Sequence, residues 1–540
     1  MGYIMSSMNI SFCISGDRLE STAVKPFVIF RDCVRPALEA RRQELKAMYA
    51  QVMGRPEINP VFLTGVTILQ MMERLPDRQA IIACQYDVRW RLALGISEDW
   101  AGIDPSTLVY FRRRLAKHRL AKVALEAGLA AMRSAGYLRQ HGAVRIDSTH
   151  VLAHVAHMSR LECVRETLRL ALDFLIAFDG SVAWEPWFSR YAECNPQELR
   201  NASVERLRST LEQAGRDARD ILVRTQTLGN TVVRSEPVVL LQRVFDEQFK
   251  ITKEGVPQEC PAAPAGAVHN PHDPDAVWST KGTLGKAGWV GYKLQICETA
   301  SESSRQPGEP TEAILTAMLT QFAITSDHSS RVPVITAHEQ GGQTKPDEVF
   351  ADAGYLSAPA LVEAQANGYV LTGPIGAPPY SGKRFGSNAF VVDIPNRKAT
   401  CPAGKISTEC SRITETKRQL TCFYFAWAKA DCALCLLKNQ CLSKKKRQPF
   451  RTLQVGEKHM IVQERRNLCK TPEYQRRMRR RNGIEGTHSE LIRGYRLRRA
   501  RYRGLGKTDV QMQFAAAACN LRRWAVRLCW LRCQEIRKVG

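Results

Sequence analysis

The hydrophobic positions between residues 27 and 135 repeat with the spacing of amphipathic helices. The run NPVFLTGVTILQMMERL predicts one helix, and DRQAIIACQYDVRWRLALGI predicts a second, which Gly95 ends. Asp104 and Pro105 supply an N-cap and a first-turn proline for a third, PSTLVYFRRRLAKHRL. Consecutive short helices ending in one rich in arginine are typical of a helix-turn-helix domain, and a plain helical bundle fits the same pattern.

The pattern changes from helical to alternating after residue 140. GAVRIDSTHVLA, residues 142–153, predicts a β-strand. A long helical stretch follows, and then a Pro/Gly-rich linker at about 255–275. Strand-like segments return at residues 289–300, 313–324 and 348–356, and at YVLTGPI after a helix that Gly368 ends. The chain therefore predicts a helical N-terminal domain followed by an α/β core.

The composition is that of a folded protein, with 44% hydrophobic and 24% charged residues among 540. No run approaches the roughly 20 apolar residues that span a bilayer. The N-terminus lacks a basic start followed by an apolar block, so we expect a cytoplasmic protein that contacts no membrane. Seventeen cysteines without export predict reduced thiols rather than a disulfide framework.

The net charge of +25 is concentrated near the C-terminus. Residues 441–540 hold 27 Lys and Arg against seven Asp and Glu, a surplus of 20 charges. Such a local excess attracts phosphate backbones through Coulomb steering and counterion release. A solvated tail or an anionic membrane surface would use the same charges. Because apolar residues such as Leu491 and Leu497 are interleaved, we expect a folded basic surface that binds nucleic acid.

Two aspartates stand where apolar strand segments meet polar residues: Asp147 follows AVRI, and Asp352 follows EVFA. Phosphodiester cleavage by two metal ions needs a few carboxylates that converge on cations about 3.5–4 Å apart. Mg²⁺ takes few protein carboxylates and completes its shell with water and phosphate. Strand-end aspartates also commonly cap turns, so each residue alone does not define a site.

A third acid, Glu485, lies among arginines in RRRNGIEGTHSELIRGYRLRRARYRGLGKT. On a helix it would share a face with Arg481 and His488, which is also the arrangement of an ordinary ion pair. Gly483 and Gly486 flank it, and their lack of side chains would suit close approach of a DNA backbone.

Two further acids, Asp273 and Asp275 in HNPHDPDA, could compete for the role of first metal ligand. Their spacing and the prolines predict a turn before a strand instead.

Several blocks resemble, in order, those of bacterial insertion-sequence DDE transposases. They are RIDSTHVLAHVAHMSRLECVRETLRLAL, DPDAVWSTKG with WVGYKLQICE, VFADAGYLSAPALVEA with GYVLTGPI, and GIEGTHSELIRGYRLRRARYRGLGKTDVQMQFAAAACNLRR. The segment LTGVTILQMMERLPDRQAIIACQYDVRWRLALGI resembles the helical N-terminal domain of these enzymes. Together the similar blocks extend over roughly residues 40–530.

The resemblance implies a ribonuclease-H-like catalytic core in which Asp147, Asp352 and Glu485 bind Mg²⁺ or Mn²⁺. It also implies that Arg481 and Tyr502 are accessory residues near DNA. Related enzymes often carry a Tyr three residues before the Arg and a Lys seven after the Glu. Here those positions are Met478 and Ile492, with Arg493 adjacent, so the accessory contacts differ from the family pattern.

Further arginines are expected to contact double-stranded DNA. We expect mostly sequence-independent phosphate contacts in the basic C-terminal region and sequence discrimination in the N-terminal helices. The residues are Arg493, Arg496, Arg498 and Arg499 in the first group, and Arg112, Arg113 and Arg114 in the second.

A cysteine cluster precedes the basic region, in a stretch (376–445) whose pattern predicts irregular structure. Cys432 and Cys435 have the two-residue spacing of a zinc knuckle, Cys401 begins the tight turn CPAG, and Cys441 follows. Four thiolates could hold a structural Zn²⁺ ion, and reduced cysteines in a packed subdomain fit the same sequence. Cys410 and Cys422 leave the choice of ligands open.

These inferences predict a transposase that binds the ends of an insertion element, cleaves DNA and transfers strands, and acts as a homo-oligomer on DNA. A catalytically inactive DNA-binding descendant and a metal-dependent nuclease without strand transfer remain as alternatives. The expected parts are a disordered leader (1–26), a helical DNA-binding domain (27–135), the first part of the core (136–375, with a helical insertion at 160–265), a cysteine-containing insertion (376–450) and a basic helical end of the core (451–540).

Overall fold

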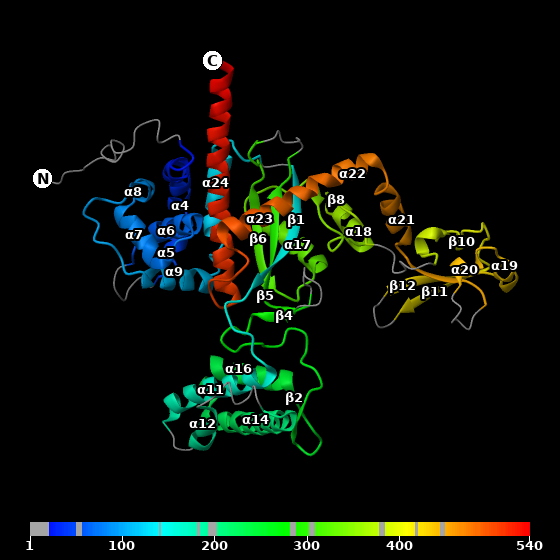
Figure 1. Ribbon diagram of the computed structural model, residues 1–540, viewed down its shortest axis with the longest axis horizontal. Coiled ribbons are helices and arrows are strands. Elements are labelled where there is room, and N and C mark those ends of the chain that lie inside the picture. The colour runs from blue at the N-terminus through cyan, green and yellow to red at the C-terminus, as the bar shows by residue number, and fades with distance from the viewer. Residues whose placement is uncertain are drawn as a thin grey trace.

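The computed structural model describes residues 21–49, 57–139, 142–180, 184–192, 202–280, 288–301, 308–376, 384–415, 420–442 and 449–539. A mixed β-sheet lies near the centre of the molecule, with the N-terminal helices on one side and a β-rich insertion extending from the other (Figure 1). A second, helical insertion projects below the sheet in this view. Residues 1–20 of the predicted leader lie outside the described residues.

The N-terminal helices form where the hydrophobic spacing predicts them. The second predicted helix is divided at Asp87, whose side chain accepts a hydrogen bond from the Arg89 amide and so caps a new helix. Gly95 ends that helix with φ +68°, a left-handed conformation that glycine adopts without strain. The helices are α3 (Lys25–Ile29), η1 (Phe30–Val34), α4 (Arg35–Glu39), α5 (Arg42–Lys46), α6 (Pro60–Glu73), α7 (Asp77–Tyr86), α8 (Val88–Leu94), α9 (Ser106–Lys117) and α10 (Val123–Ser134).

The C-terminal helix α24 (Leu505–Val539) packs against both the N-terminal helices and the sheet (Figure 1). Its buried FAAAAC run, residues 514–519, has small side chains that let neighbouring elements approach closely. Asn520 pairs with both backbone groups of Leu315, accepting from its amide and donating to its carbonyl. One hydrophobic core therefore joins the N-terminal helices, α24 and the sheet.

The central sheet has the strand order β4-β5-β1-β7-β8, with β6 also paired to β5. β1 is antiparallel to β5 and parallel to β7, β5 is antiparallel to β4 and β6, and β7 is parallel to β8. The predicted α/β class is confirmed. The strands are β1 (Ala143–Leu152), β4 (Val277–Ser279), β5 (Trp289–Thr299), β6 (Leu315–Phe322), β7 (Glu348–Phe350) and β8 (Val370–Thr372).

The two faces of β1 have different environments because successive side chains of a strand point to opposite faces. Val144 and Ile146 pack in the core beneath α17 (Asp327–Gln340) and α18 (Ala358–Ala366). Val151, of opposite parity, joins the core shared with α24. Asp147 has the parity of Val151 and therefore belongs to the face that the C-terminal helices cover.

The helical insertion forms as predicted and contains its own core, centred on α11 and α14. A Ser159 capping box begins α11. The insertion comprises α11 (Arg160–Asp179), α12 (Glu185–Ala192), α14 (Val204–Thr225), η3 (Gln226–Leu228), α15 (Asn230–Val233), α16 (Glu236–Gln248) and the short strands β2 (Phe249–Ile251) and β3 (Pro257–Glu259).

The segment at 255–275 is not the loose linker that its composition predicts. Asp273 is fully buried and accepts hydrogen bonds from the Tyr292 hydroxyl and the Gly504 amide. Asp275 accepts from the amide of Leu505, the first residue of α24. Both acids hold the start of α24, and the turn interpretation is confirmed. Their carboxylates accept structural hydrogen bonds and do not serve as the first metal ligand.

The cysteine-containing insertion is more regular than predicted. β11 (Glu409–Glu415), β12 (Leu420–Ala426) and β13 (Thr452–Gly456) form an antiparallel sheet over a small aromatic core. The prediction of irregular structure was wrong because LTCFYFA, a short run of β-forming residues, was not recognised as a strand. The remaining elements are η4 (Ser387–Ala389), β9 (Val391–Asp393), β10 (Lys398–Thr400), α19 (Lys429–Ala433) and α20 (Lys438–Cys441).

The basic C-terminal region is helical, as predicted. It runs back from the cysteine-containing insertion to the sheet along α21 (His459–Leu468), α22 (Pro472–Met478), η5 (Arg479–Asn482) and α23 (Gly483–Tyr495) before α24 begins. Among the described residues no helix is long and apolar enough to cross a membrane.

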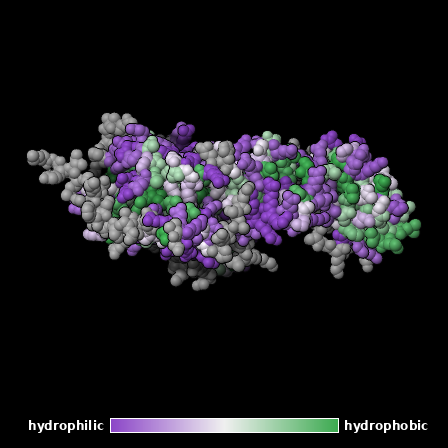
Figure 2. Space-filling model, turned by 90° about the horizontal axis from the view of Figure 1, so that it is seen from above, coloured by the Kyte–Doolittle hydropathy of each residue, from purple (hydrophilic) through white to green (hydrophobic). Residues whose placement is uncertain are grey.

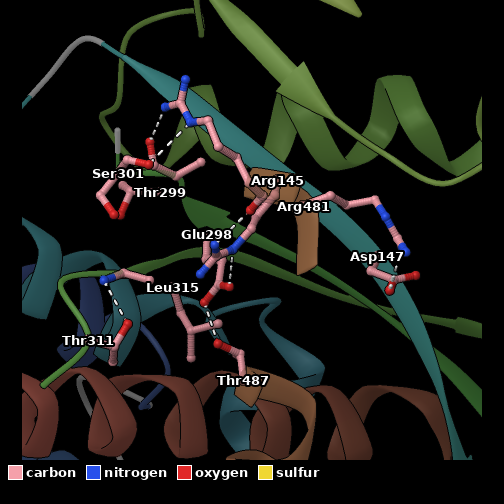
Figure 3. Close-up of polar contacts among 12 residues, drawn as sticks. Arg145, Asp147, Glu298, Thr299, Ser301, Thr311, Leu315, Arg481 and Thr487 are labelled. Carbon is pink, nitrogen blue, oxygen red and sulfur yellow. Dashed lines mark hydrogen bonds and ion pairs between the residues drawn. The ribbon is translucent and has the colours of Figure 1, made fainter. Parts of the chain in front are cut away.

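A buried carboxylate, Glu298 on β5, joins the sheet to these helices (Figure 3). It pairs with Arg145 of β1 at 2.5 Å and with Arg523 of α24 at 3.2 Å. The Thr487 hydroxyl of α23 donates to it at 2.7 Å, and Arg523 also pairs with Glu490 of α23. Four elements therefore meet at one side chain, and this contact sets where α23 lies over β1.

We expect Glu298→Gln to lower the free energy of unfolding by about 3–5 kcal/mol, since it leaves two buried guanidinium groups without their shared counter-charge. Urea unfolding of the DNA-free protein measures this. Glu457→Gln is the matched control, because its pair with Arg412 is more than half exposed and should contribute less than about 1 kcal/mol. Equal losses in the two variants would contradict a special role for Glu298.

Candidate active site

Asp147 lies in the middle of β1, on the face that α23 covers. The strand runs to Leu152, within the predicted span of 142–153, so Asp147 lies inside the strand and not at its end. The Asp147 side chain is 16% exposed, and its Oδ1 accepts a hydrogen bond from the Ser148 amide at 2.8 Å. This contact fixes the carboxylate close to the backbone.

Asp352 comes two residues after the end of β7, which runs parallel to β1 with Phe350 opposite Arg145. Its Oδ1 accepts from the Gly354 amide at 2.9 Å. Because β1 and β7 run in the same direction, Asp352 stands beside Asp147, close enough for each charge to act on the other.

Glu485 lies in the first turn of α23, and its side chain is 69% exposed. Arg481 of η5 lies between this residue and Asp147. Its Nη1 is 3.8 Å from Asp147 Oδ2, and its Nη2 is 3.7 Å from Glu485 Oε1. Figure 3 shows the Arg481 side chain reaching toward Asp147. The structure thus places Asp352 beside Asp147 and puts the Arg481 guanidinium between Asp147 and Glu485.

A fourth carboxylate, Asp327, adjoins this group and was missed from sequence. It is the first residue of α17 and is 4% exposed. Its Oδ1 accepts from the Ser148 hydroxyl at 2.8 Å and pairs with the buried Lys293 of β5 at 3.3 Å. A Cβ atom added to Gly354 would lie 3.1 Å from oxygens of both Asp327 and Asp352, so this glycine fits the narrow gap between them.

The electrostatics of the site disfavour a further negative charge. Burial, and then the charges of Asp352 and Asp327, raise the pKa of Asp147 to about 6, although the Ser148 amide and Arg481 lower it. Such crowding of acids disfavours ionisation unless a cation is present. The site therefore has the charge of a cation-binding centre.

The donor set fits Mg²⁺ or Mn²⁺, because carboxylate oxygens are the hard ligands these ions prefer. Among the described residues, no three His, Cys, Asp or Glu side chains are already arranged to hold a metal ion. Arg481 stands between Asp147 and Glu485, so Glu485 would have to turn away from the guanidinium to join the two aspartates around a cation.

Gly483 serves packing rather than approach of DNA. A Cβ atom at Gly483 would lie 2.1 Å from Nη1 of Arg145. The same Nη1 donates to the carbonyl of Arg480, which precedes Gly483 in the chain. The expectation of space for a DNA backbone therefore fails at Gly483. Around Gly486 no atom lies within 4 Å of an added Cβ, so that position is open.

The C-terminal arginines divide into exposed and bonded side chains. Three side chains are exposed: Arg493, Arg496 and Arg499. Arg498 is half-buried and donates to the Thr149 hydroxyl and the His150 carbonyl of β1. It therefore holds the segment after α23 against the strand.

The N-terminal arginines differ from the prediction in one respect. Arg112 is 3% exposed, pairs with Asp77 at 2.6 Å and lies over the Tyr502 ring. Arg112 and Tyr502 are therefore packing residues in this arrangement, because burial removes the guanidinium from contact with DNA. Arg113 is exposed, and Arg114 lies over the Tyr49 ring.

The four cysteines predicted to bind zinc, Cys401, Cys432, Cys435 and Cys441, line one small pocket far from these acids. Cys410 and Cys422 do not line it.

Comparison with known protein families gives two matches, both to transposase domains. The model described as Transposase DDE domain matches residues 400–525, and the one described as Transposase domain (DUF772) matches residues 22–114. Comparison with curated proteins and with solved structures returned no match. Together the two family matches support an insertion-sequence DDE transposase, so the resemblance seen in the sequence is confirmed. Glu485 lies inside the first match, whereas Asp147 and Asp352 lie outside both.

The raised pKa of Asp147 predicts a pH-dependent cost to the metal-free protein. A carboxyl whose pKa is raised on folding destabilises the fold as pH rises from its ordinary value of 3.8 to its folded value of about 6. We expect Asp147→Asn to remove this cost and to raise the free energy of unfolding at pH 8 by about 1–3 kcal/mol.

Urea unfolding in chelator at pH 5 and pH 8 measures this effect. The advantage of Asp147→Asn should be clearly smaller at pH 5, where the folded carboxyl is mostly protonated. Asp246→Asn, at an exposed position on α16, should show no such difference. An equal effect of Asp147→Asn at both pH values would contradict the prediction.

Proposed function

We propose that this protein cleaves DNA at the ends of an insertion element and joins the ends to target DNA, with Asp147, Asp352 and Glu485 as the metal-binding residues. The observation that carries the proposal is that Asp147 of β1 lies beside Asp352, just after β7, and is linked through Arg481 to Glu485 in the first turn of α23. The sheet supports it, because a central strand antiparallel to β5 and parallel to β7 is the arrangement expected of a ribonuclease-H-like core.

Four residues have a part in the proposed mechanism. Asp147 and Asp352, fixed by the Ser148 and Gly354 amides, would hold the cations. Glu485 is exposed and can turn toward them. Bound Mg²⁺ or Mn²⁺ would activate the attacking water or 3′-hydroxyl and stabilise the leaving oxygen. Arg481, released from Glu485, can then pair with the scissile phosphate.

The DNA path is proposed from the exposed charges. Exposed arginines lie along the end of α23 and the segment after it, at positions 493, 496 and 499. Hydrophilic side chains cover much of the middle of the molecule in Figure 2. Because cleavage at both ends of an element needs two active sites, we propose that the chain acts as a homo-oligomer on double-stranded DNA.

Substitution of the three acids tests the catalytic assignment. We expect Asp147→Asn, Asp352→Asn and Glu485→Gln each to abolish cleavage of a duplex carrying the terminal inverted repeat that flanks the gene. Binding of the same duplex should stay largely unchanged, because the amides keep the size of the side chains and lose only the charge that holds Mg²⁺. Cleavage and strand transfer are followed on labelled duplexes with Mg²⁺.

The control is Glu464→Gln, an exposed acid on α21, which should cleave normally. If any one of the three variants cleaves at the wild-type rate, that residue is not a metal ligand. Cleavage without joining in the wild-type protein would indicate the nuclease alternative, and binding without cleavage would indicate the inactive descendant.

The phosphate contacts can be tested separately. We expect Arg496→Ala with Arg499→Ala to weaken binding to specific and random duplexes alike, since phosphate contacts carry no sequence information. The slope of log affinity against log salt should flatten by about 0.9 for each phosphate that is no longer neutralised, about 1.8 in all. Titrations between low and moderate salt measure this.

Arg412→Ala, an exposed arginine on β11, serves as the control and should leave the slope unchanged. Weaker binding of the specific duplex alone would show that Arg496 and Arg499 read bases instead.

A further inference from the structure

The segment that carries Cys432, Cys435 and Cys441 makes few apolar contacts, and its half-buried Cys432 and Cys441 pack against the aromatic core of the insertion. It contains α19 and α20, helices of five and four residues in which no side chain is buried. Helices this short do not persist in water without outside contacts. Leu434 and Leu436 are 88% and 99% exposed, and hydrophobic side chains gather at this end of the molecule in Figure 2. Contacts beyond these few apolar ones must help to hold the segment in place.

The three thiols of this segment meet a fourth from a distant part of the insertion. Cys401 follows β10 at the start of a tight turn in which the Gly404 amide donates to the Cys401 carbonyl. It lines one pocket together with the other three thiols. The volume of the pocket is about 30 Å³, which is enough for a single water-sized guest. The four thiols therefore come from two separate parts of the insertion and meet at one pocket.

Charged side chains surround the pocket. Lys405, Lys438 and Arg451 also line it, as does Asp431. The Arg451 amide donates to Cys432 Sγ at 3.4 Å, and the Arg451 guanidinium donates to the Cys441 carbonyl at 2.9 Å. An amide that donates to sulfur stabilises negative charge on that sulfur. The described cysteines form no disulfides.

We propose that Cys401, Cys432, Cys435 and Cys441 bind one structural Zn²⁺ ion, which ties the 429–441 segment to the core of the insertion. Four thiolates complete the tetrahedral shell of zinc and leave no position for a reactive water. In the arrangement described, no three of these side chains already stand as ligands, so the thiols must turn toward the centre of the pocket on binding. The site is separate from the acids of the active site and does not depend on the proposed function.

The structure also decides between the cysteines of the insertion. Cys410 and Cys422 lie on the paired strands β11 and β12, opposite Phe425 and Ile413, and do not reach the pocket. They provide matched controls in the same subdomain, because their replacement should leave zinc in place.

Elemental analysis of the purified full-length protein, washed free of loose metal, tests the proposal. We expect about one Zn²⁺ per chain in the wild type and in Cys410→Ser, Cys422→Ser and Asp147→Asn. The last variant excludes zinc held adventitiously by the active-site acids. Cys432→Ser and Cys435→Ser should each lose most of the metal. Less than about half an equivalent in folded wild-type protein, or equal losses in Cys410→Ser, would overturn the proposal.

A second measurement uses only the wild-type protein. It therefore tests the proposal even if the cysteine variants do not fold. Alkylation of wild-type protein, read by mass spectrometry, should label Cys401, Cys432, Cys435 and Cys441 much faster after a zinc chelator is added, since metal-bound thiolates are protected. Labelling of Cys410 and Cys422 should not change. Equal labelling of the four thiols with and without chelator would overturn the proposal.

Discussion

The geometry of the active site depends on one buried carboxylate. Glu298 receives Arg145 from β1, Arg523 from α24 and Thr487 from α23. Buried ion pairs rarely add much net stability, because desolvation offsets their attraction. Such pairs nevertheless form only in a narrow range of geometries. Here the contacts of Glu298 constrain the position and orientation of α23 over the sheet. Glu485 lies on the same helix, so its position relative to Asp147 follows from a contact outside the candidate site.

The charges of the site lower the stability of the folded protein when no cation is bound. Burial, and then the charges of Asp352 and Asp327, raise the pKa of Asp147, and the Ser148 amide and Arg481 offset this only in part. A divalent cation would remove the repulsion, so binding and folding favour the same state. The family matches support a transposase.

Sequence predicted the strands that carry Asp147 and Asp352, because apolar runs ending in polar residues have a clear pattern. It missed α17, and with it Asp327, because an interior proline and several Ser and Thr residues weaken the helical pattern. It also assigned Arg112 and Tyr502 to DNA, although they pack on each other. Charge alone does not tell a buried arginine from an exposed one, since the difference arises from partners such as Asp77 that are distant in sequence.

The helical insertion leaves the sheet after β1 and returns at β4, and both strands pair with β5, where Gly291 lies opposite Leu152 and Val277. The chain therefore departs and re-enters at almost the same point, and the excursion has a core of its own. For an insertion whose two ends lie close together, the entropic cost of loop closure grows only with the logarithm of its length. The helical insertion can therefore become longer or shorter, or have different helices, with little loss of stability in the central sheet. The condition is that Asp273 and Asp275 still hold the start of α24.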